Sequence, residues 1–177
     1  MRYQIVMATE TNTSLRHGIL SEELRDDRSQ LIEMLTKAYW MEVETVMSYI
    51  ANSINPEGVR AQEIIESLEE DIQEELGHAR QFGERIKELY GVVPGSLDFN
   101  AEQSYLQPPD DQIDIVHVIK GVIEAESGAI AHYNDIIEYA DEHGDPVTAD
   151  MVTTILADEE GHRRLFEGFL REYERGG

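Results

Sequence analysis

Four long segments of the sequence repeat apolar residues at spacings of three and four, which is the pattern of amphipathic helices. We expect helices at roughly 27–53, 56–90, 111–142 and 146–173, with glycine and proline sparse inside them. A chain of 177 residues is long enough to enclose one core. We therefore predict an all-α fold, with a polar N-terminal extension over residues 1–27 and one four-helix bundle domain over residues 28–175.

The links between these segments predict how the helices are connected. Asn55 and Pro56 can cap and begin the second helix, Gly91 can end it, and Gly144 and Asp145 form a stop followed by a start. The 91–111 stretch reads as a loop of about twenty residues, which can reach roughly 65 Å, whereas a helix of about thirty residues is roughly 45 Å long. Such a loop can cross the full length of a bundle. We predict an antiparallel four-helix bundle with two short hairpins joined by a long crossover between the second and third helices.

Composition excludes several classes of protein. The formal net charge of −23 argues against nonspecific nucleic-acid binding, which needs a positive surface. The absence of cysteine excludes disulfides, iron–sulfur clusters and thiolate zinc sites. No apolar run is long enough to span a membrane, and the N-terminus lacks the apolar region of a signal peptide. We expect a cytoplasmic protein.

Charged and polar residues interrupt the apolar stripe of every predicted helix. Glu159 and His162 lie on the stripe that Val152, Ile155 and Phe166 define, and burial of an unpaired charge there costs several kcal/mol. Each of the other stripes also carries a glutamate, and the second helix repeats the histidine three residues later. The inward-facing set is Glu42, Glu75, His78, Glu126, Glu159 and His162.

This set is the arrangement of a di-metal carboxylate site in a helix bundle: two Glu-x-x-His motifs facing two single glutamates. Four carboxylates balance two divalent ions, and oxygen with imidazole donors suits iron and manganese. One Glu-x-x-His motif alone is weak evidence, because residues three apart are neighbours on any helix. Glu44 is the alternative to Glu42 on the first helix. Tyr49 and Tyr133 are either core residues or hydrogen-bond partners of ligand carboxylates.

At these residues the sequence resembles the ferritin-like superfamily, and within it the bacterioferritins and the bacterioferritin-like Dps-type proteins. The segments Glu75-Leu-Gly-His-Ala79 and Ile155-Leu-Ala-Asp-Glu-Glu-Gly-His162 resemble the two ligand motifs of that family, and Tyr49 matches the tyrosine that follows its first ligand. The resemblance covers residues 30–172.

The resemblance implies two iron ions per subunit, with Mn or Zn able to replace them, and Glu75 and Glu159 as the bridging ligands. It implies oxidation of Fe(II) by O2 or H2O2, storage of the product in a homo-oligomeric cage, and protection from oxidative stress. Leu76 stands where haem-binding members carry methionine, which argues against haem. The few residues after His162 leave no room for a fifth helix, so a dodecamer is favoured over a 24-mer.

Two other functions stay open at this point. A non-storage di-metal oxidase or manganese catalase-like enzyme would use the same ligands without forming a cage. A non-catalytic helical module that binds DNA or protein would hold no stoichiometric metal and would form a small oligomer.

Overall fold

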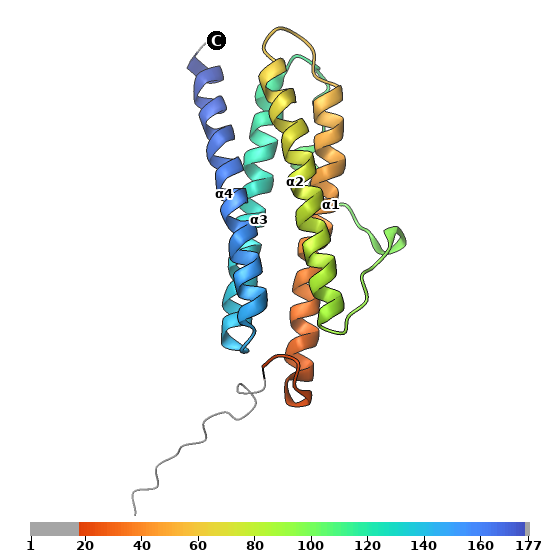
Figure 1. The fold of residues 1–177 in the computed structure, drawn as a ribbon. Coiled ribbons are helices and arrows are strands. Elements are labelled where there is room, and N and C mark those ends of the chain that lie inside the picture. The colour runs from red at the N-terminus through yellow and green to blue at the C-terminus, as the bar shows by residue number, and fades with distance from the viewer. Residues whose placement is uncertain (1–17, 176–177) are drawn as a thin grey trace, which may run out of the picture.

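The computed structural model describes residues 18–175 and consists of two helical hairpins packed side by side (Figure 1). Its long helices are α1 (Arg25–Ile54), α2 (Gln62–Glu88), α3 (Ile115–Glu142) and α4 (Pro146–Arg175). Single 3-10 turns occur at Glu22–Leu24, Ser96–Asp98 and Ser104–Leu106. No strand occurs in this part of the chain, so the all-α antiparallel four-helix bundle expected from the sequence is confirmed.

The crossover between α2 and α3 runs from one end of the bundle to the other along α1 and α3 (Figure 1). At its far end, Glu57 in the α1–α2 link donates its backbone N–H to the Gln112 carbonyl at 2.8 Å. Midway, the Tyr105 backbone lies directly on α3, where Gly121 has no side chain to obstruct it. A Cβ at Gly121 would lie 2.7 Å from the Tyr105 carbonyl oxygen. The long-crossover topology expected from the sequence is therefore present.

The start of α2 differs from the sequence prediction. Asn55 belongs to the end of α1, where its N–H bonds to the Ala51 carbonyl, and α2 begins only at Gln62. Gly58 adopts a φ of +97°, a left-handed conformation that no helix can contain. Six residues of the link therefore form a turn before α2 begins. The assignment of Asn55 and Pro56 to the second helix was wrong.

The other helix ends follow local capping chemistry. The Asp145 carboxylate accepts the Thr148 N–H at 3.1 Å at the start of α4, and Gly144 takes a φ of +71° before it, as expected. At the end of α2 the left-handed residue is Tyr90, and Gly91 donates its N–H back to the Ile86 carbonyl at 2.9 Å. The third helix starts later than expected, because Asp114 accepts the His117 N–H and so caps it.

The core consists of two apolar clusters that lie toward opposite ends of the bundle. The lower cluster, in the orientation of Figure 1, contains Leu31, Leu35, Phe82, Ile86, Ile136, Val152 and Ile155. The upper cluster contains Ile64, Leu68, Leu106, Ile119, Val122 and Phe166. Ile19 and Leu24 also pack in the lower cluster, so packing begins before α1, whereas residues 1–17 of the predicted extension lie outside the described residues.

Candidate metal centre

Six polar side chains meet between the two core clusters, and all four long helices contribute to them. They are Glu42 on α1, Glu75 and His78 on α2, Glu126 on α3, and Glu159 and His162 on α4, and every one is buried. A spacing of three residues places the carboxylate and the imidazole of each motif on the same side of its helix. The structure thus brings together every residue of the inward-facing set, while the role of these residues as metal ligands stays a prediction.

The six side chains form two overlapping groups of potential ligand atoms. One group is Glu42, Glu75, His78 and Glu159, and the other is Glu75, Glu126, Glu159 and His162. Within each group the ligand atoms lie within 4.8 Å of one another. Glu75 and Glu159 belong to both groups, which is the placement that bridging carboxylates require.

Both imidazoles direct Nδ1 toward the two shared glutamates. His78 Nδ1 lies 3.3 Å from Glu75 Oε2 and 3.1 Å from Glu159 Oε1. His162 Nδ1 lies 3.4 Å from Glu75 Oε1 and 3.6 Å from Glu159 Oε2. These four distances are similar, so the site is close to two-fold symmetric, with the α1–α2 hairpin related to the α3–α4 hairpin.

Several buried atoms at the centre lack a hydrogen bond. They include Glu75 Oε1, Glu159 Oε1 and His162 Nδ1. Buried polar atoms are nearly always satisfied in folded proteins, because each unsatisfied one costs about 1–3 kcal/mol. All three atoms are good donors to a divalent cation, so the residues present fit a pair of metal ions.

Electrostatic interactions divide the carboxylates into two kinds. Burial, and then the nearby charges of Glu75 and Glu159, raise the pKa values of Glu42 and Glu126 well above the ordinary range. Burial also acts to raise the pKa of Glu75, but the close approach of the His162 and His78 imidazoles outweighs it and lowers that pKa to about 2. The pKa of Glu159 is lowered by the same two histidines against the effect of burial.

The histidines shift in the opposite direction. Burial acts to lower their pKa values, but the neighbouring carboxylates of Glu159 and Glu75 raise the pKa of His78 to about 10 and that of His162 to about 12. The metal-free site therefore holds imidazolium groups against carboxylates, and a metal must displace their protons before it can bind.

Two tyrosines complete the site on the α1 and α3 side. The Tyr49 hydroxyl donates to Glu126 Oε1 at 2.5 Å, and the Tyr133 hydroxyl donates to Glu42 Oε1. Both rings are fully buried. The tyrosines thus fix the two glutamates that belong to only one ligand group each.

The outer nitrogen of each histidine is held by a carboxylate from the opposite helix. His162 Nε2 lies 2.9 Å from Glu74 Oε2, and His78 Nε2 lies 3.3 Å from Asp158 Oδ2. Asp71, a buried residue, approaches His162 Nε2 at 3.7 Å. Carboxylates in this position orient a ligand imidazole and increase its basicity.

Helical periodicity alone does not single out Glu74 and Asp158 as partners of the two histidines. Both side chains are about half exposed, at 59% and 51%, which is why their own helix faces read as solvated. The sequence feature that could have indicated both residues is their position, because each immediately precedes the glutamate of its Glu-x-x-His motif.

Glu44, the alternative to Glu42, has a different environment. It is buried, but both its oxygens accept backbone N–H groups of the crossover: Glu102 N at 2.9 Å and Gln103 N at 2.7 Å. It lies in neither of the two ligand groups formed by the six residues. Glu44 therefore holds the crossover against α1 through these hydrogen bonds.

The comparison with known families agrees with this geometry. A family model described as a ferritin-like domain matches residues 32–176. The chain belongs to the ferritin-like family. Among curated proteins, a bacterioferritin of Desulfovibrio desulfuricans is 26% identical over 144 residues, covering 81% of this chain and 76% of the relative.

Solved structures share the fold of this ferritin-like chain. The crystal structure of the D. desulfuricans bacterioferritin, described with a diiron site, has a TM-score of 0.74 at 22% identity and covers 85% of this chain and 84% of that one. A bacterioferritin-related protein of Bacteroides fragilis, described as a dodecameric thioferritin, has a TM-score of 0.71 at 24% identity and covers 95% and 96% of the two chains. In the described part of the chain, no helix combines the length and apolar character needed to cross a membrane.

Proposed function

We propose that this ferritin-like chain is a ferroxidase and iron-storage protein that oxidises Fe(II) at a di-iron site within one subunit. The observation that carries the proposal is the convergence of two overlapping ligand groups on unsatisfied buried atoms of Glu75, Glu159 and His162. Bound iron supplies one electron per ion to O2 or H2O2, and the oxidised iron passes to a mineral. Consumption of Fe(II) together with H2O2 removes the reactants that generate hydroxyl radicals, which gives protection from oxidative stress.

The residues of the chain hold and orient the substrate metal. Four carboxylates offset the charge of two Fe(II) ions, and two imidazoles add affinity for iron. Tyr49 and Tyr133 donate hydrogen bonds to Glu126 and Glu42, which helps to orient these two carboxylates. Leu76 is half exposed on α2 and its side chain has no donor atom for haem iron, so the proposed function includes no haem.

We further propose a homo-oligomeric cage, with a dodecamer favoured over a 24-mer, in the cytoplasm. The support is the likeness to the B. fragilis protein, which is described as dodecameric and matches nearly the whole of both chains. A cage is needed for storage, because two iron positions per subunit cannot hold a mineral.

The test compares Fe(II) oxidation rates, with O2 and with H2O2 separately, for Glu75→Ala, Glu159→Ala and Glu160→Ala. Glu160 is exposed and adjacent to Glu159, so its variant controls for loss of surface charge. We expect the first two variants to fall to the uncatalysed rate and the control to keep the full rate. Unchanged oxidation in Glu75→Ala and Glu159→Ala would contradict the assignment.

The same donor set suits manganese, so a non-storage di-metal oxidase or a manganese catalase-like enzyme is the second candidate. Native mass and iron content separate the two functions. A cage that retains far more than two iron ions per subunit supports storage, whereas a monomer or dimer with two metals supports the second candidate. A protein without stoichiometric metal would point to the non-catalytic helical module.

A further inference from the structure

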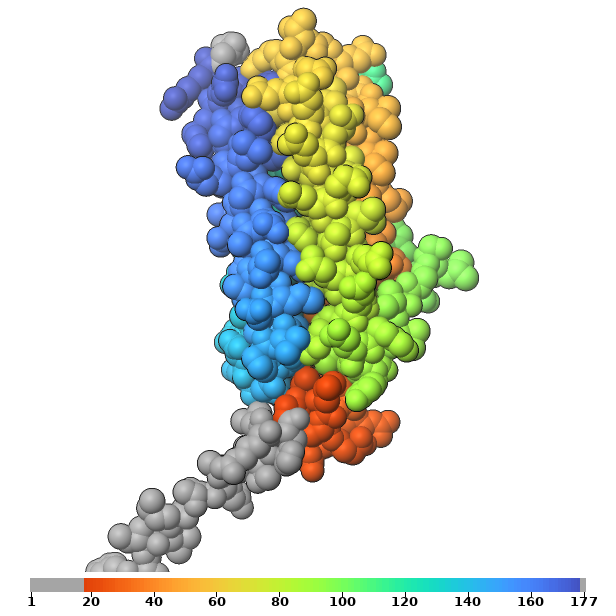
Figure 2. Space-filling model, in the orientation of Figure 1, coloured from red at the N-terminus to blue at the C-terminus, as the bar shows by residue number. Residues whose placement is uncertain are grey.

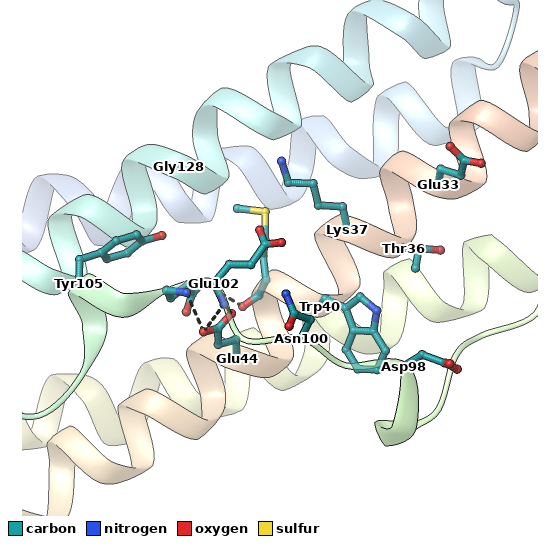
Figure 3. Close-up of a pocket in the computed structure, with 12 residues that line it drawn as sticks. Glu33, Thr36, Lys37, Trp40, Glu44, Asp98, Asn100, Glu102, Tyr105 and Gly128 are labelled. Atoms are coloured by element: carbon teal, nitrogen blue, oxygen red, sulfur yellow. Dashed lines mark hydrogen bonds between the residues drawn. The ribbon is translucent and has the colours of Figure 1, made fainter.

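A cavity of about 560 Å³ lies on the side of the bundle where the crossover passes α1 (Figure 3). Its walls are the outer face of α1, the crossover from Asp98 to Tyr105, and Gly128 of α3. None of the six candidate metal ligands lines it. The volume lies within the range of small-molecule sites in proteins, roughly 300–1,000 Å³.

The crossover wall of this cavity is fixed in place by buried polar contacts. The Glu44 carboxylate accepts the N–H groups of Glu102 and Gln103, and the Gln103 side-chain amide donates to the Met41 carbonyl at 3.2 Å and to Thr45 Oγ1 at 3.0 Å. Glu44 and Gln103 are only 6% and 4% exposed. A loop held in this way forms its cavity before a ligand arrives, which reduces the entropic cost of binding.

Aromatic side chains stand at the two ends of the cavity. Figure 3 shows the Trp40 indole at one end and the Tyr105 hydroxyl directed inward from the other. Phe99 supports the indole at a ring-centroid distance of 5.2 Å. Gly128 keeps the α3 side open, since a Cβ there would lie 3.8 Å from the Tyr105 hydroxyl and a longer side chain would enter the cavity.

The charges around the cavity are unequal. Glu33, Asp98 and Glu102 line it with free carboxylates, whereas Lys37 is its single basic residue. The pKa of Tyr105 is raised by burial and then by the negative charges of nearby glutamates, which is consistent with a negative potential. A cation gains from this potential, and tryptophan is the aromatic side chain that attracts a cation most strongly.

We propose that this cavity binds a small organic cation with an aromatic or branched apolar body, such as an arylalkylammonium. The apolar body packs on Trp40 and Met41, and the positive charge lies toward Glu102. The proposal is independent of the ferroxidase function, because the two sites share no residue.

The test uses the full-length, assembled protein and its single tryptophan. Because Trp40 lines the cavity, its fluorescence should change saturably as benzyltrimethylammonium is added. Benzyl alcohol and benzoate are the neutral and anionic controls of similar size. Binding of either control as tightly as the cation, or no binding of the cation, would overturn the proposal.

Variants locate the binding and test its charge dependence. Glu102→Gln should weaken binding of benzyltrimethylammonium by about five-fold, the effect of one partly exposed charge pair, and Lys37→Gln should strengthen it. Gly128→Leu should abolish binding, whereas Gly128→Ala should preserve it. Fe(II) oxidation by each variant serves as the control for folding and assembly.

Unchanged affinity in both Glu102→Gln and Gly128→Leu would place the ligand elsewhere and refute the proposal. If Gly128→Leu does not assemble, Glu102→Gln and Lys37→Gln decide the outcome, because they alter charge without adding volume. Affinity changes of the same sign in those two variants would also refute the proposal.

Discussion

Loading of the candidate metal centre with two divalent ions should release about four protons at pH 7. Four groups of the metal-free site are shifted toward their protonated forms. Burial and the neighbouring carboxylates raise the pKa values of Glu42 and Glu126, which favours the neutral carboxyl, and the pKa values of about 10 for His78 and about 12 for His162 keep these imidazoles charged at pH 7.

Glu75 and Glu159 complete the charge balance. Their lowered pKa values leave both ionised, so two imidazolium groups neutralise two carboxylates before metal binds. After binding, four carboxylates neutralise two divalent ions. The site is therefore neutral both without metal and with two divalent ions, provided that about four protons leave on binding. Because protons are products of binding, metal affinity should rise with pH, and the number released should decrease by about one above pH 10, where His78 is already neutral.

Calorimetric titration with Zn²⁺ measures this exchange, because zinc binds such donors without redox chemistry. Titrations at pH 7 in buffers of different ionisation enthalpy give the proton count from the slope of the observed enthalpy. Glu42→Gln is the matched control, since the amide carries no exchangeable proton of this kind and its variant should release one proton fewer. Release of two protons or fewer, or an equal count from the variant, would refute this account of the site.

Three further changes should appear in unfolding measurements. The metal-free protein should lose stability as pH rises above about 6.5, the pKa of histidine in the unfolded chain. Below that pH the stabilising contribution of protonated His78 and His162 is complete, and it is lost as the pH passes their folded pKa values of about 10 and about 12. A flat or rising midpoint of urea denaturation between pH 7 and 10 would contradict this sign. Gly121→Ala should cost about 1–3 kcal/mol, since its Cβ would lie 2.7 Å from the Tyr105 carbonyl and the crossover must move. Gly161 lies in an exposed part of α4 with open space around it, so Gly161→Ala should raise the free energy of unfolding by about 0.5–1 kcal/mol through helix propensity alone. The midpoint temperatures of thermal unfolding of the two glycine variants should therefore shift in opposite directions.

Long helices were predictable from the sequence because their periodicity extends over many turns. The start of α2 was not, because it depends on contacts between distant parts of the chain. The N–H of Glu57 bonds to the Gln112 carbonyl in the crossover, and Gly58 takes its left-handed conformation in that turn. The Pro56 signal for a helix start is local and carries no information about the crossover.

The same distinction applies to the metal centre. The six inward residues were visible because each interrupts an apolar stripe, which is a property of its own helix. Glu74 and Asp158 were missed because each acts on a histidine of another helix, and their own faces read as solvated. The cavity beside Trp40 was missed for the same reason, since its walls come from α1, α3 and the crossover.

The division of the core into two clusters has a consequence for cooperativity. Each cluster has roughly half the buried apolar side chains of the bundle, and a layer of carboxylates and imidazoles lies between them. Small cores are individually weak, and the polar layer separates the apolar side chains of one cluster from those of the other. A pair of metal ions held by residues of all four helices would link the two halves. We therefore expect the two ends of the metal-loaded subunit to unfold more nearly as one unit than those of the metal-free subunit, apart from any role of the metal in oxidising iron.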